Sequence, residues 1–164
     1  APPGDEPARL RPATDPQRRR RMIGAPMVES PFEPSYRYGL RVYWEDTDAG
    51  GGVFYANYLK FFERARTEWL RAAGFEQQAL RQTHGVIFVV TETQVRYLRP
   101  ARLDDWLEIG VRPREIGRAT MTLAQQARRG VELLAEGEIR IGCVDAASLR
   151  PRRIPAGMVE RIRG

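Results

Sequence analysis

The residues best suited to chemistry lie in the segment Tyr43–Arg71, which reads YWEDTDAGGGVFYANYLKFFERARTEWLR. An aspartate, Asp48, stands in an acidic, glycine-rich stretch directly before a predicted amphipathic helix. The first N–H groups of a helix have no partner within it, and the helix dipole makes that end positive. A carboxylate beside such donors can attack a carbonyl carbon, because it supplies a base or nucleophile while the N–H groups hold the oxyanion.

Other catalytic signatures are missing from the sequence, which contains no G-x-S-x-G elbow, no Walker loop and no G-x-G-x-x-G run. The glycines at 50–52 are not followed by Lys and Ser/Thr at P-loop spacing. Carboxylate chemistry remains, and its candidates are Asp46, Asp48, Glu63 and Glu68. Asp46 and Asp48 equally suit turn-building, because aspartate beside threonine and glycine forms Asx turns and caps helices.

A strand and a helix flank this loop. Apolar residues alternate with others over Tyr36–Trp44, which predicts a half-buried strand, and the loop Glu45–Val53 follows. The helix then runs to about Ala73, and Gly74 is suited to end it. Its apolar residues recur at i, i+3, i+4 spacing and form one face: Tyr58, Phe61, Phe62, Ala65, Trp69 and Ala72.

Four further strands are predicted, at Val86–Tyr97, Trp106–Arg112, Ala119–Ala127 and Leu133–Val144, and short helical turns at Glu76–Gln82 and Ala156–Arg163. Short connections make the strands antiparallel neighbours. The fold class is therefore α+β, with one long helix packed on an antiparallel sheet.

The first 34 residues differ from the rest, since they hold eight of the twelve prolines and show no periodicity. They predict a disordered Pro/Arg-rich tail before a domain over residues 35–164. The basic run Arg18–Arg21 fits either a solvated tail or a contact with nucleic acid or acidic lipid.

Composition narrows the function classes. A length of 164 residues suits one domain, and the net charge of +6 suits an anionic partner. The single cysteine, Cys143, and the single histidine, His84, predict no disulfide within the chain, no metal site and a reducing cytoplasm. No apolar run approaches the roughly 18 residues of a membrane span, so we expect a soluble protein.

The run DTDAGGGVFYANYLKFFERARTEWL resembles the signature of the 4-hydroxybenzoyl-CoA thioesterase family, above all its acyl-CoA thioesterases associated with the Tol–Pal system. The likeness continues through VVTETQVRYLRPARLDDWLEI and GCVD to RRIPAGMVERI, and so covers about residues 36–162. It implies a hotdog fold, in which a five-stranded antiparallel sheet wraps one long central helix. It also implies homodimers with sheets joined edge to edge, often paired into homotetramers, and active sites at the dimer interface.

The resemblance also implies roles for individual residues. The family's catalytic aspartate falls on Asp48, as nucleophile or as general base on water, and its backbone oxyanion donor falls on Tyr55. Three arginines near the end of the long strand, Arg96, Arg99 and Arg102, suit the CoA phosphates, although a solvated strand edge explains them at least equally well. We expect contacts with the substrate from Gly51, Val53, Phe54, Asn57, Arg96 and Arg99.

The chain departs from the family pattern at two positions. Many members of the Tol–Pal type carry Tyr-His where this chain has Phe54-Tyr55, and that histidine assists catalysis in them. Tyrosine occurs in the 4-hydroxybenzoyl-CoA branch, where the main-chain N–H acts. Gly52 replaces the usual aliphatic residue, which loosens the loop or enlarges the acyl pocket.

The leading hypothesis is therefore an acyl-CoA thioesterase that releases a free acid and CoA and needs no cofactor, since CoA is part of the substrate. The alternatives are a non-catalytic hotdog module that binds acyl-CoA or acyl carrier protein, and a nucleic-acid binder, which rests on charge alone. Among the remaining candidates, Glu63 suits pairing with Arg66, Cys143 a buried apolar site in a strand, and His84 a surface turn.

Overall fold

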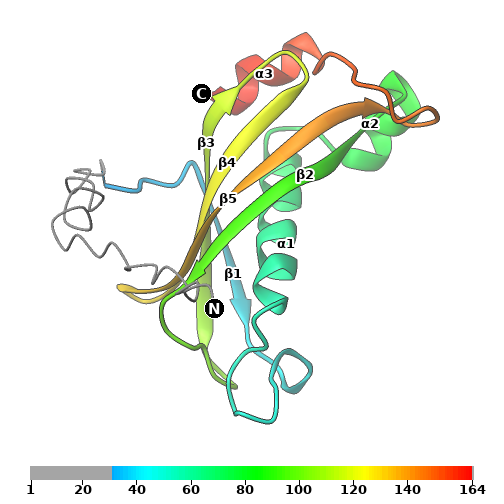
Figure 1. Ribbon diagram of the computed structural model, residues 1–164. Coiled ribbons are helices and arrows are strands. Elements are labelled where there is room, and N and C mark those ends of the chain that lie inside the picture. The colour runs from blue at the N-terminus through cyan, green and yellow to red at the C-terminus, as the bar shows by residue number, and fades with distance from the viewer. Residues whose placement is uncertain (1–30, 164) are drawn as a thin grey trace, which may run out of the picture. The chain divides into compact units, whose positions relative to one another are not determined.

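The computed structural model describes residues 31–163, so the expected tail lies almost wholly outside the described residues. One antiparallel sheet has the strand order β1-β3-β4-β5-β2. Its strands are β1 (Tyr36–Arg41), β2 (Val86–Tyr97), β3 (Trp106–Ile116), β4 (Thr120–Arg129) and β5 (Glu132–Asp145). The helices are the 3-10 turn η2 (Trp44–Asp46), α1 (Asn57–Ala72), α2 (Gln77–His84) and α3 (Ala156–Arg163). The sheet curves around α1 (Figure 1), which confirms the predicted hotdog fold.

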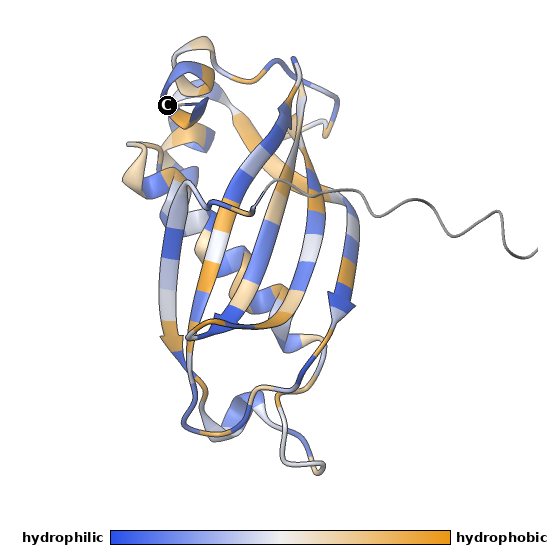
Figure 2. Cartoon of the chain, turned by 90° about the vertical axis from the view of Figure 1, so that its left-hand side faces the viewer, coloured by the Kyte–Doolittle hydropathy of each residue, from blue (hydrophilic) through white to orange (hydrophobic). Residues whose placement is uncertain are grey.

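Alternation of side chains gives the sheet one apolar face. Leu107, Ile109 and Val111 of β3 are fully buried beneath α1. The intervening residues point to the other face, and Figure 2 shows polar and apolar residues alternating along the strands. One face packed and one face solvated is the pattern expected of an antiparallel sheet.

The apolar face of α1 forms the centre of the core. Phe61, Phe62 and Ala65 have no exposed surface, and α1 lies against β1 and β3. Burying a phenylalanine side chain stabilises the fold by about 1.5–3 kcal/mol. The N-terminal end of α1 is therefore held firmly, which fixes the loop that leads into it.

The first strand is shorter than predicted, and the expected place of Trp44 on its buried face is wrong. β1 ends at Arg41, which pairs with Trp106 at the start of β3, so no strand remains opposite Trp44. The chain instead closes the turn η2, in which the Asp46 N–H donates to the Tyr43 carbonyl at 3.1 Å. Trp44 is 79% exposed as a result.

Helix α1 begins later than predicted, whereas its end at Ala72, followed by Gly74 with φ +92°, agrees with the prediction. It begins at Asn57 rather than directly after Val53, because the Asn57 N–H donates to the Phe54 carbonyl at 2.8 Å and closes a turn first. Near its C-terminus Ala72 is exposed and Leu70 is 2% exposed. The i, i+4 spacing predicted Ala72 on the buried face, whereas Leu70 is buried instead; α1 also contacts α2.

Strand β2 occupies one edge of the sheet and, among the described strands, pairs with β5 alone. Most of its residues are exposed, including Val90 at 52% and Tyr97 at 44%. Exposed strand edges carry free N–H and C=O groups and readily pair with another strand. Within the described residues, no helix is long and apolar enough to cross a membrane.

Candidate functional site

The candidate site is built on the loop between η2 and α1, at the lower end of the sheet in Figure 1. Thr47 and Val53 form an antiparallel bridge across this loop. Inside it, the Asp48 N–H donates to the Gly52 carbonyl at 3.0 Å, and the Gly51 N–H donates to the Asp48 carbonyl at 3.0 Å. Gly51 has φ +78°, which glycine adopts at little cost. The loop is therefore a tight, defined turn.

The side chain of Asp48 is exposed and belongs to this turn. Its Oδ1 accepts a hydrogen bond from the Gly50 N–H at 2.8 Å, which is the Asx turn that the sequence offered as an alternative. Among the described residues, its second carboxylate oxygen accepts no hydrogen bond. The turn thus orients the carboxylate and leaves one oxygen accessible, so the turn-building and catalytic interpretations of Asp48 are compatible.

Asp46, the other aspartate of the pair, is structural. It is 6% exposed, and its Oδ2 accepts a hydrogen bond from the Tyr43 N–H at 2.8 Å. Its carbonyl accepts from the Phe54 N–H at 2.9 Å and from Asn57 Nδ2 at 2.9 Å. Asn57 is 8% exposed and holds the loop to the start of α1, so its contact with a substrate stays a prediction.

Tyr55 lies in the turn that leads into α1, two residues before the helix begins. Its side chain is 63% exposed. Neither the Tyr55 N–H nor the Ala56 N–H donates to an acceptor within residues 31–163. Both donors lie at the positive end of the α1 dipole, where a developing negative charge is stabilised. The sequence identified Tyr55 but gave no reason to include Ala56.

Aromatic rings connect this turn to the end of β2. The Tyr55 ring centroid lies 4.8 Å from that of Phe54 and 6.0 Å from that of Tyr97, which in turn lies 5.5 Å from that of Tyr58. Burial raises the pKa of Tyr97, and the neighbouring Tyr55 raises it further. Burial also raises the pKa of Tyr58, against a hydrogen bond from Ala101. These phenols are therefore uncharged at neutral pH. Tyr97 was not predicted as a site residue, although it ends the long strand.

Two of the three arginines proposed for the CoA phosphates form ion pairs at the surface. Arg96 pairs with Glu136, and Arg99 Nη1 lies 3.3 Å from Glu132 Oε1. The guanidinium of Arg102 is exposed and forms no ion pair with another described residue. The three side chains occupy the end of β2 and the connection after it, near the aromatic residues, so their contact with CoA stays a prediction.

The connection between β2 and β3 pairs through its backbone with the site loop. The Val53 N–H donates to the Ala101 carbonyl at 2.8 Å, and Gly52 bridges Arg102. A Cβ added at Gly52 would lie 3.4 Å from the Ala101 carbonyl oxygen. The loop therefore follows the neighbouring backbone closely where the family usually carries an aliphatic residue.

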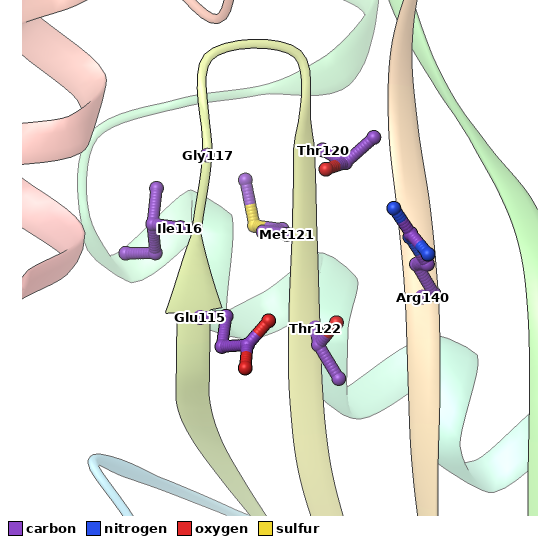
Figure 3. A pocket seen from close by; sticks show the side chains of 7 residues that line it. All are labelled: Glu115, Ile116, Gly117, Thr120, Met121, Thr122 and Arg140. Carbon is purple, nitrogen blue, oxygen red and sulfur yellow. The ribbon is translucent and has the colours of Figure 1, made fainter.

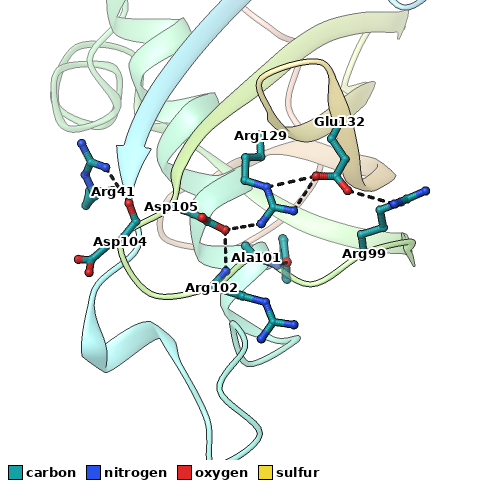
Figure 4. A network of polar contacts seen from close by, with 9 residues as sticks. Arg41, Arg99, Ala101, Arg102, Asp104, Asp105, Arg129 and Glu132 are labelled. Atoms are coloured by element: carbon teal, nitrogen blue, oxygen red, sulfur yellow. Dashed lines mark hydrogen bonds and ion pairs between the residues drawn. The ribbon is translucent and has the colours of Figure 1, made fainter.

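Four charged side chains hold this connection to the β4–β5 turn (Figure 4). They are named here the Arg129 network and consist of Arg129, Asp105, Glu132 and Arg99. Arg129 Nη1 lies 2.6 Å from Asp105 Oδ2, and Arg129 Nη2 lies 2.6 Å from Glu132 Oε2. The hydrogen bonds that Arg129 donates to Glu132 and to Asp105 raise the pKa of Arg129, the bond to Glu132 contributing most, and the bond from Arg129 lowers the pKa of Glu132. The sequence gave no signal for this network.

Three other sequence interpretations have clear outcomes. The predicted pairing of Glu63 with Arg66 is wrong, because Glu63 Oε1 accepts from Thr67 at 2.7 Å and Arg66 Nη1 donates to Gln125 Oε1 at 2.8 Å. Cys143 is 1% exposed within β5, as predicted, and burial raises the pKa of its thiol. His84 is exposed at the end of α2, also as predicted.

A cavity at the opposite end of the sheet contains none of the predicted site residues. It lies at the β3–β4 turn, where its lining includes Glu115, Met121 and Arg140 (Figure 3). The Asp48 loop and this cavity occupy opposite ends of the strands in Figure 1. The loop before α1 therefore remains the candidate site.

Comparison with known proteins agrees with this assignment. The model of the thioesterase-like superfamily matches residues 42–162. An acyl-CoA thioesterase YbgC from Haemophilus influenzae is 40% identical over 124 residues, which cover 76% of this chain and 91% of the relative. An acyl-CoA thioester hydrolase YbgC from Escherichia coli O157:H7 is 44% identical over 125 residues, covering 76% and 92%.

A solved structure shares both fold and sequence. A probable thioesterase from Bartonella henselae superposes with a TM-score of 0.71 at 34% identity, covering 73% of this chain and 98% of the other. The matched region contains the Asp48 loop, α1 and all strands after them. The chain belongs to the thioesterase-like superfamily.

Proposed function

We propose that this chain hydrolyses an acyl-CoA thioester to a free acid and CoA. The observation that carries the proposal is that one short segment before α1, in a member of this superfamily, holds an oriented, accessible Asp48 carboxylate and the N–H groups of Tyr55 and Ala56, which donate to no acceptor among the described residues. The curated relatives with about 40% identity bear the names of acyl-CoA thioesterases. The chemistry of the loop and the sequence similarity to these relatives support the same reaction.

In the proposed mechanism the thioester carbonyl oxygen approaches the Tyr55 N–H, at the positive end of α1. Asp48 then acts in one of two ways. As a nucleophile, its free oxygen forms an anhydride with the acyl group and CoA leaves as a thiolate, after which water hydrolyses the anhydride. As a general base, Asp48 takes a proton from the water that attacks the carbonyl carbon; the C–S bond then breaks, and Asp48 gives the proton to the departing CoA thiolate. Both routes regenerate the Asp48 carboxylate.

The decisive experiment incubates the purified protein with acyl-CoAs of different chain length and aromaticity in the presence of a thiol-reactive dye. Release of free CoA thiol above the rate without protein is expected for at least one of them. A single turnover in ¹⁸O-water then tests the nucleophilic route, since ¹⁸O enters Asp48 only when water attacks the aspartyl Cγ of the anhydride. Label in the released acid alone is the result of the general-base route or of water attack at the acyl carbon of the anhydride. Binding of acyl-CoA without release of thiol from any substrate would support the alternative, a non-catalytic binding module.

We also propose that the chain acts as a homodimer, paired further into a homotetramer, and acts in the cytoplasm. Strand β2 ends the sheet with a free edge, and Val90 and Tyr97 are exposed along it. Pairing of two β2 strands would satisfy the N–H and C=O groups along this edge. Sedimentation or light scattering measures the mass directly, and a monomer at micromolar concentration would contradict this proposal. Acyl carrier protein remains a candidate acyl donor, to be tested beside CoA in the same assay.

A further inference from the structure

The site loop has a support that lies outside it, in the connection between β2 and β3. Ala101 is fully buried, and its carbonyl accepts the Val53 N–H at 2.8 Å. Gly52 forms an antiparallel bridge with Arg102. Val53 directly precedes Phe54 and Tyr55, while the Gly52 carbonyl accepts the Asp48 N–H at 3.0 Å. A shift of Ala101 and Arg102 is therefore transmitted to both groups proposed for catalysis.

Two side chains also hold the backbone of Ala101 and Arg102 in place, in addition to these backbone contacts. The Ala101 N–H donates to the Tyr58 hydroxyl at 3.1 Å, and the Arg102 N–H donates to Asp105 Oδ2 at 2.8 Å. The same Asp105 oxygen accepts from Arg129 Nη1 at 2.6 Å. One carboxylate oxygen thus joins the backbone of the connection to the end of β4.

Arg129 is in turn fixed from its other side. Its Nε and Nη2 donate to Glu132 Oε2 at 3.2 and 2.6 Å, and Glu132 Oε1 also accepts a hydrogen bond from Arg99 Nη1. The side chains of Arg129, Asp105 and Glu132 are 33%, 21% and 31% exposed, so partial burial limits their screening by water. The planar guanidinium donates to the two carboxylates from separate nitrogens in a rigid fork, a geometry that the compact ammonium group of lysine does not reproduce.

We infer that Asp105 and Arg129 are positioning residues for the Asp48–Tyr55 site. Neither residue touches the substrate. Arg129 holds Asp105, Asp105 holds the Arg102 N–H, and the adjacent Ala101 carbonyl holds the Val53 N–H of the site loop. This inference rests on the proposed thioesterase function for its kinetic consequence, but its structural part does not. A misplacement of about 1 Å far from the reacting atoms can cost 10²-fold in rate.

The kinetic test compares kcat and KM of Asp105→Asn, Asp105→Ala, Arg129→Gln and Arg129→Lys proteins at a temperature well below each melting midpoint. We expect kcat to fall by about 10- to 100-fold with KM changed by less than about threefold, since alignment rather than substrate contact is lost. Arg129→Lys should not restore activity. The double variant Asp105→Asn/Arg129→Gln should be no slower than the slower single variant, because the pair acts as a unit.

The matched control is Glu108→Gln, which breaks the exposed ion pair between Arg37 and Glu108 across β1 and β3. That pair has no contact with the β2–β3 connection, so kcat should change by less than about twofold. Loss of activity in the Asp105 and Arg129 variants only in proportion to their unfolded fraction would reduce the pair to a stability role and overturn the inference.

Amide hydrogen exchange gives a second measurement that needs no substrate. The Val53 N–H should exchange at least about tenfold faster in Asp105→Ala than in the unchanged protein, and at the same rate in Glu108→Gln. Unchanged protection of Val53 in Asp105→Ala would overturn the inference directly. Absence of hydrolysis with every acyl-CoA would instead refute the proposed function, while the exchange experiment would still decide the positioning role.

Discussion

Replacement of Tyr55 by proline tests the assignment of its backbone N–H as the oxyanion donor. Tyr55 is the second residue of the turn closed by the 2.8 Å hydrogen bond from the Asn57 N–H to the Phe54 carbonyl. Proline is favoured at this position of a β-turn, and the Tyr55 N–H donates to no acceptor among the described residues. Tyr55→Pro therefore removes a donor that the fold does not use, and the protein should remain folded.

The expected loss in kcat is that of removing a single oxyanion donor, because proline at position 55 deletes this N–H and no other. Removal of one oxyanion donor costs about 2.7–4 kcal/mol of transition-state stabilisation, or about 10²–10³-fold in kcat. Tyr55→Pro also removes the ring that lies against Phe54 and Tyr97, so Tyr55→Ala is the matched control. We expect Tyr55→Phe to retain most activity, Tyr55→Ala to lose the ring contribution alone, and Tyr55→Pro to fall about 10²–10³-fold below Tyr55→Ala.

The assay is thiol release from the best acyl-CoA, with circular dichroism and sedimentation to confirm fold and assembly. Equal kcat values for Tyr55→Pro and Tyr55→Ala would refute the assignment and make the neighbouring Ala56 N–H the donor. Complete loss of turnover in a folded Tyr55→Phe protein would show that the hydroxyl itself acts, as an acid or as an anchor for the substrate.

Three further outcomes are expected. Asp48→Asn retains the size of the side chain and should lower kcat by at least about 10²-fold in a folded protein, so near-normal thiol release would remove Asp48 from the mechanism. Phe61→Ala should lower the free energy of unfolding by about 3–5 kcal/mol in denaturant titrations, because Phe61 has no exposed surface, and a loss below about 1 kcal/mol would contradict its place in the core. Burial raises the pKa of Tyr58 above 10.0, so its contribution to stability is complete below pH 10.0 and is lost as pH rises through the folded value. Denaturant titrations across this alkaline range should show a steeper loss of stability for the unchanged protein than for Tyr58→Phe, and parallel losses would contradict the assignment.

Local patterns predicted most of the fold because they depend on neighbours in sequence. The long strand Val86–Tyr97 and the last helix Ala156–Arg163 have the predicted bounds. Trp44 was misplaced because alternation continues past the last residue that β3 can pair. Glu63 was assigned to Arg66 by spacing alone, whereas the guanidinium reaches Gln125 on β4, which no spacing rule within a helix includes.

The candidate site divides in the same way. Asp48 and Tyr55 could be proposed from the sequence because they occupy one continuous motif. Their proposed roles come from the resemblance to the family. Asp105 and Arg129 were missed because 24 residues separate them, and their contact depends on how β3 and β4 align. A sequence can display such a pair only as two charges near predicted strand ends, which is an ordinary feature of exposed turns.

The exposure of the candidate site links its chemistry to assembly. N–H donors stabilise an oxyanion strongly only where water is excluded, because water screens charge and competes for hydrogen bonds. In one subunit, however, Asp48 is exposed and Tyr55 is 63% exposed. The acyl-CoA substrate and the partner subunit of the proposed homodimer could each cover the site. The ring of Tyr97 belongs to β2, an edge strand among the described strands, and lies 6.0 Å from that of Tyr55. In the proposed dimer, a partner strand on β2 would approach the same aromatic residues that border the proposed oxyanion donor, and assembly would then also control the access of water to the site.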